Sequence, residues 1–291
     1  MIDQFLSHHK LYRKQVILIL MSFLCVQIAE AKKNVTTLPS PEALAAINDS
    51  IIKEGHQLYL FEKLNWELTD LFLAHHRREE IGGQMTYRAK DSTIIAFFCD
   101  KSMKNCLYEL RYEKASPKFI AVDSVRPLTQ EEKELVVLKD VLIAKMETLA
   151  DSVNGVSPDF GQFNANIIRF NDHITRLYLL TGTIKPSIIP FGNDYSFDFT
   201  NDNRLVAFRR YHRSLIPTQT KHKGKTVVST IHSHLKDNPY ITATDICNFL
   251  LYGRDIAGMK SFHVYSTACD CLFAYWDGDK PVIKIEEIPE E

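Results

Sequence analysis

Apolar residues recur every three or four positions from residue 42 to about residue 78, a period that predicts one or two amphipathic helices. Beyond Gly82 and Gly83 the pattern changes to short runs rich in β-branched and aromatic residues, each bounded by polar turn residues. These runs predict a meander of four strands. They cover residues 84–89, 93–99, 106–112 and 118–125.

A second helix is expected after the meander. Thr129 lies three residues before Glu132, which predicts a capping box at the start of a helix that extends to about residue 149. Residues 42–150 therefore form a predicted helix–sheet–helix module. Glycines and a proline between residues 151 and 161 mark the boundary after it.

The second half is predicted to consist mainly of strands. Residues 163–180 indicate a helix followed by an extended segment, and the other strand-like runs cover residues 187–189, 195–200, 204–216, 226–231, 261–267 and 271–276. Between the runs 226–231 and 261–267, Thr242 is expected to cap a helix that extends to about residue 253. The predicted fold class is α+β, with the helix/β-meander/helix module followed by a mixed β-sheet with flanking helices over residues 160–285.

Residues 1–31 have the layout of a secretory signal peptide. Basic residues precede a short apolar run over residues 16–26, and Ala29 and Ala31 form a small-x-small cleavage site. The run is shorter than the roughly 20 residues that a membrane-spanning helix needs. We therefore expect a secreted bacterial protein, periplasmic or extracellular, with no membrane contact beyond the signal segment.

Composition narrows the class of partner. The chain is 45% hydrophobic, so it is expected to fold. It has 35 Lys+Arg against 36 Asp+Glu, and this balance gives no reason to expect the clustered positive field that nucleic-acid binding requires. In an oxidising compartment Cys99 and Cys106 are placed to bridge across a turn. Cys269 and Cys271 share one face of a strand, where small core residues are expected.

The residues that carry chemistry are His232, His234, Thr242 and Asp245. Residues two apart in a strand point to the same side, so the two histidines can present their imidazoles to one ion. A carboxylate in the first turn of the next helix completes a three-ligand face. Two His and one Asp with an open fourth position form a catalytic zinc arrangement.

This pattern, His-x-His, seven residues, then Ser/Thr-x-x-Asp, resembles the signature of the JAMM/MPN+ metalloproteases. The resemblance implies a JAMM-like domain that binds Zn²⁺ through His232, His234 and Asp245, with the Thr242 hydroxyl stabilising an oxyanion. It further implies hydrolysis of a peptide, isopeptide or similar amide, with a protein, peptide or cell-wall fragment as partner. The two-part layout also resembles secreted proteins of Bacteroidetes-type bacteria.

The chain departs from the family pattern in two ways. Leu235 stands where the family has proline, and the family's upstream glutamate, a general base, has no clear counterpart. Asp194, at the start of a strand, and Glu80, in a Glu-x-x-Gly stretch, are the two candidates, and a third interpretation is that no base exists. His212 lies in a basic run interpreted as a surface strand that could line a cleft near the metal.

Two alternatives to an enzyme stay open. One is a catalytically degenerate JAMM-like domain that acts as a binding or interaction module. The other is that the histidines bind nothing, and that Thr242 and Asp245 only cap a helix.

Overall fold

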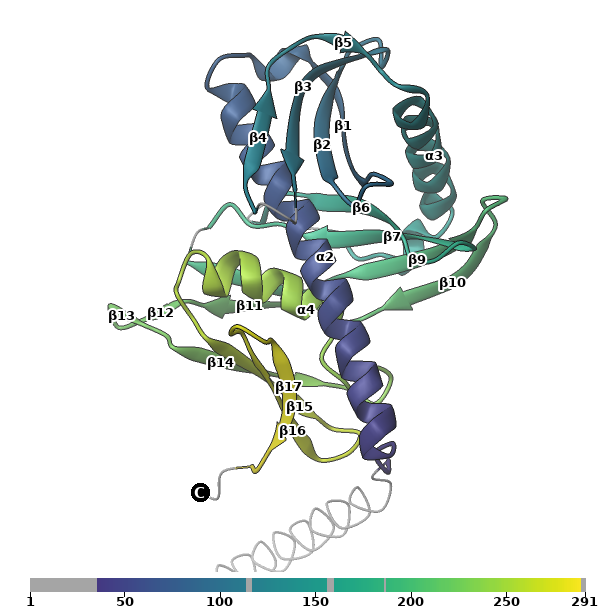
Figure 1. Cartoon of the computed structure of the whole chain (residues 1–291). Coiled ribbons are helices and arrows are strands. Elements are labelled where there is room, and N and C mark those ends of the chain that lie inside the picture. Colours follow the sequence, from purple (N-terminus) through teal and green to yellow (C-terminus); the bar gives the residue numbers. More distant parts are fainter. Residues whose placement is uncertain (1–35, 114–116, 156–159, 186, 289–291) are drawn as a thin grey trace, which may run out of the picture.

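The computed structural model describes residues 36–113, 117–155, 160–185 and 187–288 (Figure 1). Its first helix, α2 (Pro41–Leu73), is one continuous helix where the sequence predicted one or two. The Ser40 hydroxyl caps it by accepting a hydrogen bond from the Ala43 N–H at 3.3 Å. The predicted signal peptide, residues 1–31, lies outside the described residues. Within the described ranges no helix is long and apolar enough to cross a membrane.

The predicted meander is confirmed as an antiparallel sheet in which four strands are neighbours in chain order and a short fifth pairs with β3. Its strands are β1 (Ile81–Arg88), β2 (Ile94–Asp100), β3 (Asn105–Tyr112), β4 (Phe119–Val122) and β5 (Arg126–Pro127). The next helix, α3 (Gln130–Glu147), begins with the predicted capping box. Thr129 Oγ1 accepts from the Glu132 N–H at 3.2 Å, and the Thr129 N–H donates to Glu132 at 2.8 Å.

Cys99 and Cys106 are cross-strand partners in β2 and β3, as the bridge would require, but both are buried free thiols. Burial raises the pKa of Cys99 to about 12 and that of Cys106 to about 11. The two side chains therefore pack as small core residues in this structure.

The prediction of a helix at the start of residues 163–180 is wrong, because this segment forms two strands, β6 (Phe163–Arg169) and β7 (Ile174–Thr181). Asn171 explains the difference. Its side-chain oxygen accepts hydrogen bonds from the N–H groups of His173 and Ile174 at 2.9 and 3.0 Å, which forms an Asx turn between the strands.

The strand predicted over residues 204–216 is interrupted. It divides into β10 (Leu205–Arg210) and β11 (Leu215–Gln219), and residues 211–214 form a loop. β10 belongs to a sheet with the order β10-β9-β7-β6, whereas β11 pairs with β8. The bounds are Ile188–Gly192 for β8 and Tyr195–Thr200 for β9.

The last sheet carries the His-x-His segment. Strand β14 pairs in parallel with β15, and β15, β16 and β17 follow as antiparallel neighbours. A short hairpin of β12 (Lys221–His222) and β13 (Lys225–Thr226) precedes it. The sheet and its helix are β14 (Ser229–His234), α4 (Ala243–Asn248), β15 (Ser261–Ser266), β16 (Cys271–Trp276) and β17 (Val282–Glu286), with a π-helical turn, Phe249–Arg254, after α4. The predicted α+β class is confirmed.

Helix α2 connects the two halves of the chain (Figure 1). The largest buried cluster contains Leu58 and Phe72 of α2, Ile94 of the N-terminal sheet, and Ile246 and Phe262 of the C-terminal half. Helices α2 and α4 approach closely at Gly55, where an added Cβ would lie 2.7 Å from the Ile246 Cβ. The predicted units 42–150 and 160–285 thus share a core along α2.

Candidate metal centre

The histidines of β14 point inward together. His232 and His234 are buried, while Ile231, Ser233 and Leu235 are exposed, so burial alternates along the strand. The Nε2 atoms of the two histidines lie 3.1 Å apart. The strand therefore presents both imidazoles to the same point, as the sequence predicted.

The start of α4 adds the carboxylate. Thr242 caps the helix by accepting from the Asp245 N–H at 3.2 Å. In return, the Thr242 N–H and hydroxyl donate to Asp245 Oδ2 at 2.9 and 2.7 Å. These contacts hold one carboxylate oxygen, and the other, Oδ1, lies 3.3 Å from His232 Nε2.

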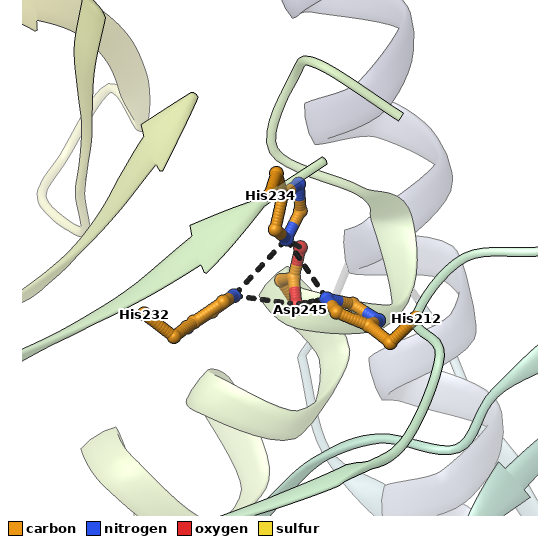
Figure 2. Close-up of side chains that lie close together, drawn as sticks. All are labelled: His212, His232, His234 and Asp245. Carbon is orange, nitrogen blue, oxygen red and sulfur yellow. Dashed lines mark hydrogen bonds and ion pairs between the residues drawn. The ribbon is translucent and has the colours of Figure 1, made fainter. Parts of the chain in front are cut away.

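A fourth side chain, His212, completes the group (Figure 2). It extends from the loop between β10 and β11, and its Nε2 lies 2.8 Å from His234 Nε2 and 3.3 Å from Asp245 Oδ1. The four potential ligand atoms all lie within 4.8 Å of one another, and all four residues are buried. This buried cluster of His212, His232, His234 and Asp245 can hold a metal ion.

Four of the six separations in the cluster are close to those of a small coordination shell. Four ligands about 2.0 Å from one ion in a tetrahedron lie about 3.3 Å from each other. His234 Nε2 lies 2.8 Å from His212 Nε2 and 3.1 Å from His232 Nε2, and Asp245 Oδ1 lies 3.3 Å from the Nε2 atoms of both His212 and His232. In addition, Asp245 Oδ1 is buried and makes no hydrogen bond among the described residues, and the Nε2 atoms of His212 and His232 each lie 3.3 Å from it. A buried carboxylate oxygen is stabilised by a cation, which a bound metal ion or a protonated imidazole supplies.

Two of the imidazoles are fixed by contacts on the side away from the cluster. Asp194 Oδ1 lies 2.7 Å from His212 Nδ1, and the carbonyl of Tyr240 accepts from His234 Nδ1 at 2.7 Å. Such partners orient a histidine so that its other nitrogen carries the lone pair for the metal. His232 Nδ1 is buried without a partner in the described part of the chain.

The charges of the cluster are strongly coupled. Burial lowers the pKa of His234 to about 4, with the neighbouring His212 and His232 adding to the effect and Asp245 opposing it. Burial also acts to lower the pKa of His212, but Asp194 and Asp245 outweigh it and hold that pKa well above its usual value. Burial acts to raise the pKa of Asp245, but the three imidazoles outweigh it and hold that pKa well below its usual range.

The turn before β9 positions the loop that carries His212. The Tyr211 N–H donates to the Asp194 carbonyl at 3.1 Å, and the Asn193 N–H donates to the Ser214 carbonyl at 3.2 Å. Gly192 has a left-handed φ of 78°, and an added Cβ would lie 2.3 Å from the Ser214 carbonyl oxygen. This close approach requires glycine.

The two candidate bases lie in different places. Asp194 is fully buried behind His212, and its second oxygen accepts from the Thr244 hydroxyl, so both oxygens are engaged. Glu80 ends the short 3-10 turn Arg78–Glu80 just before β1, where it accepts from the Arg77 N–H at 3.1 Å and lies 3.7 Å from His76. The structure thus places Asp194 next to a ligand and Glu80 outside the cluster. Thr242, expected at an oxyanion, binds the Asp245 carboxylate.

A cleft of about 610 Å³ adjoins the cluster. Its lining includes His212, His232 and His234, the cations Arg210 and Arg213, and the carboxylate of Asp237. A small molecule or a short peptide fits a cleft of this volume.

Sequence reasoning missed His212 as a ligand because it assigned residues 204–216 to one strand. Two polar segments, Gly-Asn-Asp at 192–194 and the basic run around residue 212, were the available signal for a loop at residue 212. The fold brings these two segments together. No family model, no curated protein and no solved structure matches this chain.

Proposed function

We propose that this chain binds one Zn²⁺ ion through His212, His232, His234 and Asp245, and that the ion fixes the C-terminal half as a binding module. The observation that carries the proposal is the convergence of four buried ligand atoms from three separate segments of the chain. These segments are the loop at residues 211–214, strand β14 and the first turn of α4. An ion bound by all three would hold them in one arrangement.

The ligand types favour zinc. Three imidazoles and one carboxylate suit a borderline transition metal, whereas Ca²⁺ and Mg²⁺ prefer shells made of oxygen. The four separations of 2.8 to 3.3 Å among the three Nε2 atoms and Asp245 Oδ1 are compatible with the short bonds of zinc.

The number of ligands favours a closed site. Structural zinc sites have four protein ligands, whereas catalytic sites have three and leave one position open. The JAMM-like resemblance implies three protein ligands and a fourth position for water, whereas His212 offers this chain a fourth protein ligand. The resemblance therefore supports the roles of His232, His234 and Asp245, while His212 favours the non-catalytic alternative with a protein, peptide or cell-wall fragment as partner.

Cobalt substitution tests the closed site. Co²⁺ replaces Zn²⁺ with similar geometry, and its visible absorption reports the coordination number. We expect a four-coordinate spectrum that does not respond to added azide, and a five-coordinate or azide-sensitive spectrum in His212→Ala. An azide-sensitive spectrum in the wild-type protein would contradict the proposal.

A second candidate is a zinc-dependent hydrolase of a peptide, isopeptide or similar amide, favoured by the cleft of about 610 Å³ beside the histidines. In this function His232, His234 and Asp245 hold the metal, which when bound supplies Lewis acidity. His212 then accepts and returns a proton at Nε2, and Asp194 orients its ring through Nδ1.

The two candidates differ in what His212→Ala does. If His212 is a general base, the variant no longer cleaves a peptide or isopeptide library but still binds zinc. If His212 is a ligand, the variant binds zinc more weakly. A protein that retains one zinc in His212→Ala, and cleaves amides only with His212 present, would favour the hydrolase.

A further inference from the structure

A second cavity, of about 410 Å³, lies apart from the histidine cluster, where α2, β1, α3 and β6 meet. None of the four cluster residues lines it. Its volume falls within the roughly 300–1,000 Å³ of small-molecule sites. Most of its lining is polar, and the residues used below are Glu62, Asn65, Gln84, Lys139, Asn164 and Asn166.

A buried carboxyl group forms part of its floor. Glu62 is 2% exposed, and it accepts hydrogen bonds from the side-chain amide of Asn164 at 2.7 Å and from that of Asn166. The other polar side-chain atom of Asn166, Oδ1, is buried and has no hydrogen-bond partner within the described ranges. Native proteins rarely leave such an acceptor unmatched, and since Asn166 lines the cavity, a small shift of its side chain would open this atom to a ligand hydroxyl.

The walls add hydrogen-bonding groups of both kinds. Asn65 Oδ1 accepts from the Gln84 side chain at 3.0 Å and from the Thr86 hydroxyl. Lys139 donates one of its three N–H groups to the Gln84 carbonyl at 2.8 Å. Trp66, which packs edge-on against Tyr252, adds an aromatic surface to the same lining.

Two titratable groups of the lining favour a neutral ligand over an ion. Burial raises the pKa of Glu62 and lowers that of Lys139, so both shifts reduce the charge that these groups offer to an ionic ligand. An apolar ligand would leave the amides unmatched.

We propose that this cavity binds a neutral, hydroxyl-rich ligand, a mono- or disaccharide. Sugar hydroxyl groups both donate and accept, which matches the mixture of carboxyl, amide and ammonium groups in the lining. The Asn166 Oδ1 acceptor and the Glu62 carboxyl group recognise hydroxyls at the floor, and Trp66 contacts the apolar face of the ring.

Saturation-transfer NMR with the full chain tests this proposal. The probes are glucose, galactose, mannose, N-acetylglucosamine and their β-1,4-linked disaccharides, each at about 10 mM, which detects even weak affinities. We expect at least one sugar to bind, and Asn166→Leu to weaken it about tenfold or more. Gln84→Ala, at a half-buried wall position, provides a second variant if Asn166→Leu fails to fold.

The matched control is Gln130→Ala, which removes the same amide from an exposed position on α3. It should leave sugar binding unchanged. The proposal is overturned if no sugar of the panel binds, or if binding is equally strong in the wild-type protein and the folded cavity variants. Binding that acetate or putrescine displaces competitively would also overturn it, because it would show a site for ions.

Discussion

Asp194 Oδ1 lies 2.7 Å from His212 Nδ1, so a carboxylate considered as a catalytic base stands directly behind a histidine of the cluster. Both oxygens of Asp194 are engaged, one with His212 and one with the Thr244 hydroxyl. This relationship gives Asp194 a positioning role. Asp194 also joins the turn before β9 directly to the first turn of α4, because the Thr244 hydroxyl donates to its second oxygen.

Replacing Asp194 should weaken metal binding. We expect Asp194→Asn, which removes the charge behind His212, to lower zinc affinity about 10- to 100-fold, as measured by competition with a chromophoric chelator. Asp237→Asn is the control, because Asp237 is exposed in the same cleft and lies 3.8 Å from Arg213. Unchanged zinc affinity in Asp194→Asn and Asp194→Ala would remove the positioning role.

Thr242→Ala should reduce both stability and zinc affinity, because Thr242 caps α4 and donates to the Asp245 carboxylate. Loss of such a cap costs about 0.5–2 kcal/mol of folding free energy. Thr242→Ser keeps the hydroxyl and should restore both properties. Thermal unfolding and chelator competition measure them, and an alanine variant with wild-type values would show that the cap does not support the site.

A methyl group at Gly192 should disturb the loop that carries His212. Gly192→Ala places a Cβ 2.3 Å from the Ser214 carbonyl oxygen, in addition to the cost of a left-handed φ. Gly224→Ala is a close control, since its φ is 77° but nothing lies within 4 Å of the added Cβ. We expect a loss of about 1 kcal/mol for the control and clearly more for Gly192→Ala by urea unfolding. Equal losses, or unchanged zinc affinity in Gly192→Ala, would contradict this description.

The buried Glu62 should make stability depend on pH. Burial raises its folded pKa above the usual 4.5, so its favourable contribution is present at low pH and is lost as pH rises towards the folded pKa. Relative to Glu62→Gln, the wild-type protein should therefore lose unfolding free energy as pH rises from about 4.5 through the raised folded pKa. Urea titrations at a series of pH values measure the difference, with Glu67→Gln on the same helix as control. Parallel profiles for the wild-type protein and Glu62→Gln would reject the effect.

The part of the fold with regular periodicity could be predicted from the sequence. The β-meander, the Thr129–Glu132 capping box and the strand-to-helix path from His232 to Asp245 all depend on local patterns, and the structure confirms them. The segment 163–180 was misassigned because apolar residues there fit a helix until the Asx turn at Asn171 is recognised.

The fourth member of the cluster could not be found by local reasoning. His212 reaches the cluster because β10 ends at Arg210 and the loop that follows packs against the turn at Gly192, where the Asn193 N–H donates to the Ser214 carbonyl. Those contacts join segments about 20 residues apart, and strand alternation alone says nothing about them. Asp194 is a candidate base in the sequence for the same reason, because the sequence does not show that it contacts His212 or that His212 belongs to the cluster.

The most direct test of the account is the zinc content of the purified protein, measured by mass spectrometry after equilibration with buffered Zn²⁺ at neutral pH, beside the single alanine variants at His212, His232, His234 and Asp245. We expect about one zinc per chain in the wild-type protein and at least a roughly tenfold loss of affinity in each variant, His212→Ala included. A wild-type protein that binds no zinc, or a His212→Ala variant with wild-type affinity, would contradict the four-ligand site.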